Sequence, residues 1–143
     1  MKARTFTVPF DKVVGEDATE LEFGPDDYLV VRPIFSMSAL DIRATQNRIE
    51  AFEAKPAEAQ KIADPKKRAA EMNRLNTEAG ELILSLMDLA VLDWKLEGEQ
   101  GPIDRPRTVE ALDNLPGAIR GGLYSFLCNY RGDVDGANPT IRS

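Results

Sequence analysis

The stretch that decides the fold runs from Asp64 to Trp94 and reads DPKKRAAEMNRLNTEAGELILSLMDLAVLDW. Aspartate caps the free amides of a helix start and proline is tolerated at the first helical position, so Asp64-Pro65 predicts a helix N-terminus. The apolar residues that follow are alternately three and four positions apart, which places them on one helix face: Met72, Leu75, Ala79, Leu82, Leu86 and Leu89, with Ile83 and Ala90 widening it. We therefore expect one long helix, from Pro65 to about Trp94, that organises the domain.

This apolar face resembles a heptad seam but covers only about three repeats. Packing inside the domain, against strands and C-terminal helices, is therefore favoured over a coiled coil. Gly80 weakens the helix by about 1 kcal/mol relative to alanine, unless another backbone packs closely against it.

The first 35 residues predict a β segment. Apolar and polar residues alternate, or β-branched and aromatic residues follow one another, in three stretches: Thr5–Phe10, Glu20–Phe23 and Tyr28–Ile34. Pro9 and Pro33 have no N–H to donate to a ladder, so their strands are expected to be short or at a sheet edge. So few strands are marginal alone and must pack on helices.

Helical signals follow from residue 36 onward. Ser38, with Asp41 three residues later, predicts a capped helix that runs to about Lys55 and is stopped by Pro56. Its partly apolar face is made by Leu40, Ile42, Ile49 and Phe52. The next stretch, residues 57–64, fits either another helical turn or a linker.

After the long helix, residues 97–102 predict a surface loop, and Thr108 can cap a short helix. Pro116 opens a last helix in which Gly121-Gly122 permits close approach to another element. The apolar residues of these two helices are Val109, Leu112, Leu115, Ile119, Leu123, Phe126, Leu127 and Tyr130. The sequence therefore predicts an α+β, mainly α fold: a β segment (1–35), a helical domain around one long helix (36–131) and a flexible tail (132–143), one compact domain overall.

Composition and charge narrow the classes of function. The chain is 43% hydrophobic and 29% charged, which is typical of a globular protein, and no apolar run approaches the roughly 20 residues of a membrane span. The first ten residues lack the continuous apolar run of a secretory signal. With Cys128 as the only cysteine no internal disulfide can form, so a cytoplasmic location is expected.

The net charge is −6, from 18 basic and 24 acidic side chains, and this repels nucleic acid on average. The one basic cluster, Lys66-Lys67-Arg68, is more typical of a solvated face. We expect neither nucleic acid nor a membrane as the partner.

Catalytic and metal-binding patterns are missing from the sequence. There is no histidine, the commonest general base near neutral pH and the commonest metal ligand. No phosphate-binding glycine motif occurs, and Cys128 lies in an apolar helix that favours a packed thiol. Acidic pairs exist, but a chain with 24 acidic residues produces close pairs by chance: Asp26-Asp27, Asp88 with Asp93, and Asp133 with Asp135. We expect no enzyme activity, no cofactor and no metal.

Trp94 is the only tryptophan and follows directly on the apolar face of the long helix. It has two possible roles. It can be a core plug at the end of the domain, which we favour, or an interface anchor with its indole N–H at the rim.

One part of the sequence resembles the tail assembly chaperones of long-tailed bacteriophages. The resemblance covers about a third of the chain, from Leu82 to Tyr130. It is carried by LAVLDWKL (residues 89–96), the charged Gly-Pro loop of residues 98–102, and PRTVEALDNLP (residues 106–116), which leads into the final helix. That family has a β-rich N-terminal segment followed by a helical domain.

The resemblance implies a non-enzymatic viral protein that acts in the host cytoplasm. Such a chaperone binds the tape-measure protein, keeps its hydrophobic helices from aggregating and recruits tail-tube subunits. It could form homo-oligomers. An apolar groove for a client helix would be made by Trp94, Leu112, Leu115, Leu123, Phe126 and Tyr130, although each is also a typical core residue. The alternative is a structural virion component, such as a head-tail connector or tail completion protein. A small carboxylate enzyme is a third, less favoured reading.

Overall fold

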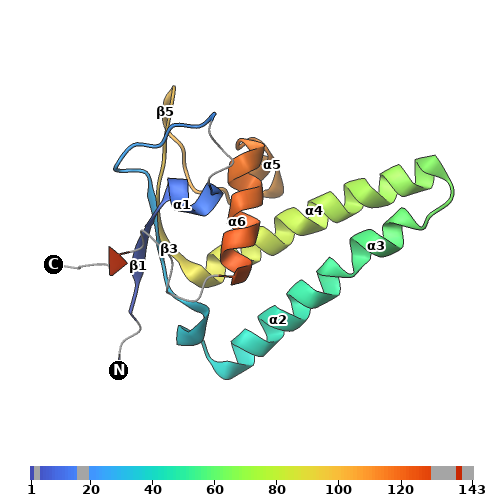
Figure 1. The fold of residues 1–143 in the computed structure, drawn as a ribbon, viewed down its shortest axis with the longest axis horizontal. Coiled ribbons are helices and arrows are strands. Elements are labelled where there is room, and N and C mark those ends of the chain that lie inside the picture. Colours follow the sequence, from blue (N-terminus) through green and yellow to red (C-terminus); the bar gives the residue numbers. More distant parts are fainter. Residues whose placement is uncertain (2–3, 16–19, 130–137, 140–143) are drawn as a thin grey trace.

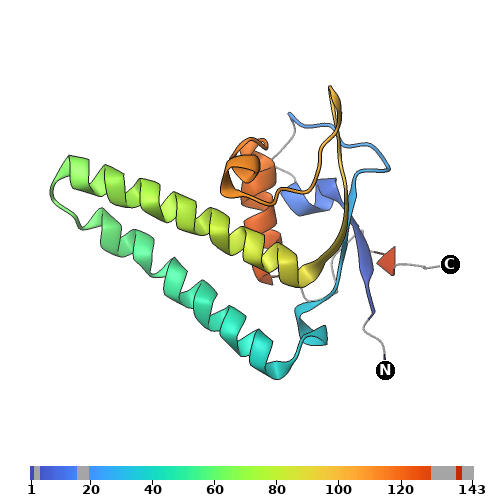
Figure 2. The ribbon, with the colours of Figure 1, turned by 180° about the vertical axis from the view of Figure 1, so that it is seen from behind.

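The computed structural model describes residues 1, 4–15, 20–129 and 138–139, and it confirms an α+β fold that is mainly helical. An antiparallel sheet has helices α1, α5 and α6 on one side, and a helical arm extends away from it (Figures 1 and 2). The elements are β1 (Phe6–Pro9), α1 (Phe10–Val14), β2 (Tyr28–Val31), η1 (Ile34–Ser36), α2 (Ala39–Glu53), α3 (Lys55–Gln60), α4 (Pro65–Ala90), β3 (Val91–Lys95), β4 (Glu97–Gly98), β5 (Gly101–Pro102), α5 (Val109–Asp113), α6 (Gly117–Asn129) and β6 (Asn138–Pro139).

The main sheet has the strand order β3-β2-β1-β6. Strand β1 pairs with β2 in the register Val8↔Leu29, and β2 pairs with β3 in the register Leu29↔Trp94. The strands expected around residues 5–10 and 28–34 are confirmed as β1 and β2. The sheet is completed by β3, from the predicted helical domain, and β6, from the predicted tail, so it joins all three predicted segments of the chain.

The strand predicted at Glu20–Phe23 is wrong. These residues form no strand, and Leu21 and Phe23 instead pack half-buried against the core. The ring of Phe23 stacks on that of Phe10, with 5.7 Å between centroids. Because the stretch is short and is followed at once by a turn at Gly24, its two apolar side chains fill space beside the sheet rather than extend it.

Helix α4 begins as predicted, since the backbone N–H of Lys66 donates to Asp64 Oδ1 at 2.9 Å. Its predicted end at Trp94 is wrong, because the helix stops at Ala90 and Val91–Lys95 becomes β3. Pairing with β2 competes with the helix here. Arg32 caps the last turn: its backbone N–H donates to the Ala90 carbonyl (2.9 Å) and its Nε to the Leu89 carbonyl (2.6 Å). Across the described residues, no helix has the length and apolar character of a membrane span.

The arm consists of α2, α3 and the N-terminal half of α4, which run side by side away from the sheet (Figure 2). The predicted cap of α2 is confirmed, since the Asp41 N–H donates to Ser38 Oγ at 3.1 Å. Helix α2 ends at Glu53, close to the predicted end at Lys55. Pro56, which was predicted to stop the helix, instead lies in the first turn of α3, where its missing N–H is tolerated. Residues 57–60 are therefore helical, which was one of the two expectations for the stretch of residues 57–64.

Two glycines allow helices to approach. A Cβ on Gly80 would lie 3.0 Å from Val109 Cγ1, so α5 packs over α4 at this point. A Cβ on Gly122 would lie 2.8 Å from both the Val13 carbonyl oxygen and Val14 Cα, so the backbones of α1 and α6 are in direct contact. The close approach expected at Gly121-Gly122 is thus made by Gly122.

The predicted C-terminal tail differs from the structure at two residues. Asn138–Pro139 pairs with β1 as strand β6, in the register Phe6↔Pro139. Residues 132–137 and 140–143 lie outside the described residues. The loop predicted at residues 97–102 is a tight hairpin, β4 against β5, and Gly101 has the positive φ of 118° that it requires.

The contact between α1 and α6 makes a paired prediction. Replacement Gly122→Ala forces a methyl group into the α1 backbone and should lower the free energy of unfolding by about 1–3 kcal/mol. The control Gly121→Ala meets nothing within 4 Å and should raise it by up to about 1 kcal/mol, as expected in a helix. Urea denaturation measures both. Equal effects of the two substitutions would contradict the packing of α1 on α6.

Candidate functional site

Four of the residues expected to bind a partner are buried in the core. Their exposed fractions are 0% for Leu112 and Leu123, 8% for Leu115 and 9% for Phe126. Tyr130 lies outside the described residues. The four side chains are therefore covered in this structure, and a partner could not reach them without displacing other elements.

Trp94 lies on β3 rather than on the long helix, and its side chain is half-buried. Its ring meets that of Phe10 edge-on, with 5.0 Å between centroids. The indole Nε1 donates to the Ile103 carbonyl at 2.9 Å. Both the apolar and the polar part of this side chain are thus used within the chain, which agrees with the favoured role of a core plug.

The acidic pairs serve the fold where the structure describes them. Asp27 is 4% exposed and accepts two backbone bonds, from Gly24 N (2.7 Å) and Glu97 N (2.9 Å), so it links two loops. Asp88 pairs with Arg105 at 2.5 Å, and Asp93 Oδ1 accepts from the N–H of Trp94. Asp133 and Asp135 lie outside the described residues. Within the described part of the chain, no three His, Cys, Asp or Glu side chains are placed to hold a metal ion.

An open groove of about 570 Å³ lies along the arm. Its floor is apolar, with Phe52 from α2 and Leu82 from α4. Charged and small residues line the rest: Arg48, Ala51, Lys55, Arg74, Thr77, Glu78 and Glu81. Helices α2 and α4, which are distant in sequence, thus form the two walls of the groove. Helix α3 and the turn after it bring them together.

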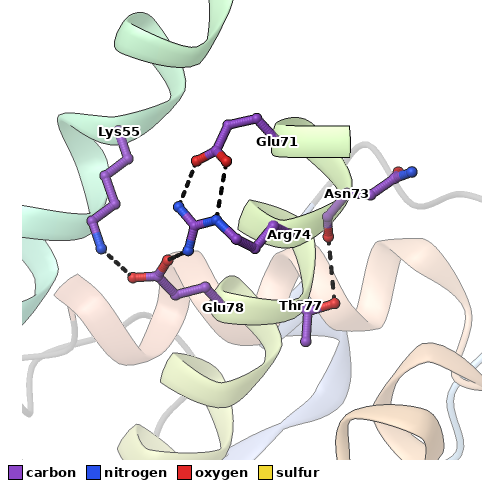
Figure 3. A network of polar contacts seen from close by, with 6 residues as sticks. All are labelled: Lys55, Glu71, Asn73, Arg74, Thr77 and Glu78. Carbon is purple, nitrogen blue, oxygen red and sulfur yellow. Dashed lines mark hydrogen bonds and ion pairs between the residues drawn. The ribbon is translucent and has the colours of Figure 1, made fainter. Parts of the chain in front are cut away.

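Four charged residues cross this part of the arm; we call them the arm network (Figure 3). Lys55 Nζ lies 2.5 Å from Glu78 Oε1 and joins α3 to α4. On α4, Arg74 bridges Glu78 at 3.2 Å and Glu71 at 2.5 Å. The hydrogen bond from Lys55 holds the pKa of Glu78 below its ordinary value, and the bond from Arg74 does the same for Glu71.

At its base the groove is closed by contacts with α6. The ring of Phe52 meets that of Tyr124 with 6.2 Å between centroids, and Tyr124 Oη donates to Glu53 Oε1 at 3.1 Å. Burial is the main cause that raises the pKa of Tyr124, so this hydroxyl keeps its proton and remains a donor. Cys128 is half-buried and packs against the core, as expected.

An apolar floor with a charged rim is suited to holding an amphipathic helix, because it removes apolar surface from water while the polar flanks stay solvated. Sequence reasoning placed Phe52 and Leu82 on apolar faces but missed that they share a groove. Their helical spacing was the available signal, and it does not tell which two faces meet.

Other hollows lie elsewhere on the described surface. One, of about 360 Å³, follows β3 beside Trp94, and one of about 620 Å³ lies between α1 and α6 over Gly121 and Gly122. The second is a shallow depression over small residues. Unlike this depression, the arm groove has a large apolar side chain from each of its two walls, Phe52 and Leu82.

Comparisons with known proteins found no matching family model and no significant match to a curated protein or a solved structure.

Because Asp27 is buried and bonded twice, Asp27→Ala should leave two N–H groups without partners and lower the free energy of unfolding by about 1–3 kcal/mol for each. Its neighbour Asp26 is exposed, and Asp26→Ala should change stability by less than about 0.5 kcal/mol. Thermal and urea unfolding compare the two. A small effect of Asp27→Ala would show that Asp27 does not hold the loops.

The arm network should weaken in acid. Its carboxylates have lowered pKa values in the folded state, so their stabilisation is present above the usual glutamate range and is lost as pH falls through the folded pKa. Wild type should therefore exceed Glu78→Gln in denaturation midpoint at pH 7, and the difference should shrink as the pH falls below the ordinary glutamate range. Because these groups are partly exposed, the difference should also shrink in high salt. A difference that stays constant as the solution is acidified would contradict an ionic role for Glu78.

Proposed function

We propose that this protein is a non-enzymatic phage tail assembly chaperone. It binds the tape-measure protein in the host cytoplasm and recruits tail-tube subunits. The observation that carries the proposal is the helical arm, whose groove offers an apolar floor and a charged rim to a client helix. The resemblance of residues 82–130 to such chaperones supplies the identity of the client.

The physical basis is burial of client surface. A tape-measure protein has long helices with apolar faces that aggregate when exposed, and covering them gains roughly 25 cal/mol per Å² of apolar surface. The net charge of −6 keeps the chain and its complexes apart from one another in solution. Neither effect requires a catalytic group.

Co-expression with the products of neighbouring genes, followed by pull-down of the tagged chain, tests the proposal. A long helical protein should be recovered. Ala51 is exposed and lines the groove, so Ala51→Glu should reduce this recovery about tenfold, the equivalent of about 1.4 kcal/mol. Ala69 is exposed on α4 outside the groove, and Ala69→Glu is the matched control.

Two results would contradict the proposal. One is recovery of no long helical protein with any neighbouring product. The other is presence of the chain at defined copy number in purified particles, as found by mass spectrometry, which favours the alternative of a structural virion component. If the two variants Ala51→Glu and Ala69→Glu recover equal amounts of the client, the client is still bound, but the groove is not its binding site.

A further inference from the structure

Among the described residues that line the arm groove, each wall has one charged side chain without an ion pair. Arg48 lies on the α2 wall and Glu81 on the α4 wall, and both are exposed. The other charges of the groove, on Lys55, Arg74 and Glu78, are paired within the arm network. The groove therefore presents a cation along one side and an anion along the other.

The groove lies on the face of α4 that the C-terminal helices leave open. Successive helix residues are about 100° apart, so Arg74, Glu78 and Glu81 lie within about 60° of one another. Asn76 and Gly80, which contact α6 and α5, lie on the opposite face. A partner as large as a pair of helices can therefore reach the groove without meeting α5 or α6.

This charge pattern is complementary to itself. A two-fold axis along the arm places α2 of one copy over α4 of a second copy, so that Arg48 faces the partner's Glu81. In an isologous contact of this kind the same pair is made twice. A two-fold axis across the arm would instead place α2 over α2 and α4 over α4, and would bring walls of like charge together. The charges thus select the first arrangement.

We infer that a second copy of this chain docks on the arm groove, with the two arms parallel and α2 of each over α4 of the other. This inference goes beyond the proposed function, since it assigns an occupant to the groove when no client is present. The second copy leaves α2 in place, so Ala51 and Phe52 still line the groove after it dissociates. A client helix and a second copy exclude one another, and self-association therefore regulates access to the groove.

The size of the contact makes the dimer weak and reversible. Helix α2 has 15 residues, so two helices of this length, about 10 Å wide each, cover about 450 Å² on each copy and about 900 Å² in total. Stable interfaces bury roughly 1,200–2,000 Å². Leu82 is only 2% exposed, so the floor adds little apolar surface. The charged pairs therefore contribute a large part of the attraction.

Sedimentation velocity of the full chain, without any partner, is the first test. The average mass should rise from monomer toward dimer between about 10 µM and about 1 mM protein. Because the pairs are exposed, the dimer should dissociate when the salt concentration is raised to about 1 M. A chain that stays monomeric over the whole concentration range would overturn the inference.

Charge reversal is the second test. Arg48→Glu and Glu81→Lys each turn two attractive pairs into two repulsive ones, and each should raise the dissociation constant of the dimer at least about tenfold. An equimolar mixture of the two variants should associate as wild type does. In the mixed dimer each reversed charge faces the other reversed charge, and each native charge faces a native one.

The matched controls are Arg43→Glu and Glu50→Lys, which make the same changes at exposed positions of α2 outside the groove. They should leave the dissociation constant as in wild type, and circular dichroism verifies that all four variants fold. Controls that weaken the dimer as much as the groove variants, or a mixture that does not recover, would refute the arrangement. If a groove variant does not fold, sedimentation of the wild type decides.

These tests are independent of the pull-down. A monomeric wild type together with recovery of a long helical protein would overturn the dimer and leave the proposed function. A dimer with the expected charge dependence, together with no recovered client, would do the reverse.

Discussion

Burial of the apolar face of α4 is the constraint on which the rest of the structure depends. Toward its C-terminal end, Ile83 and Met87 are covered by the sheet and the C-terminal helices, and Gly80 lets α5 approach. Toward its N-terminal end, the same face has only the arm to cover it, where Leu75 is buried and α3 packs alongside. One helix thus serves a well-packed body and a sparsely packed arm, and this difference in packing places the candidate site on the arm.

Features set by local chemistry could be predicted from the sequence. Ser38, Asp64 and Thr108 each cap a helix as expected, because capping depends on a side chain and the amides two or three residues ahead. Features set by competition between distant segments could not. The apolar pattern of α4 continues to Trp94, and only the pairing of Val91–Lys95 with β2 turns those residues into a strand.

Prediction of the candidate site from the sequence meets the same limit. Leu112, Leu115, Leu123 and Phe126 have the spacing of a helix face, and spacing alone does not separate a face that meets the core from one that meets a partner. In the structure these side chains are core. The groove instead depends on how α2 and α4 lie after the chain reverses at the tip of the arm, with Pro56 accommodated in the first turn of α3. No local pattern specifies that arrangement.

The central claim is that the arm groove between α2 and α4 binds an amphipathic helix of a client. The most direct measurement maps the binding of an amphipathic helical peptide to the isotope-labelled chain by NMR chemical-shift changes. The account predicts the largest changes at residues that line the groove, such as Ala51, Phe52, Thr77 and Glu81. Changes confined to the strands β1 to β3 would contradict it.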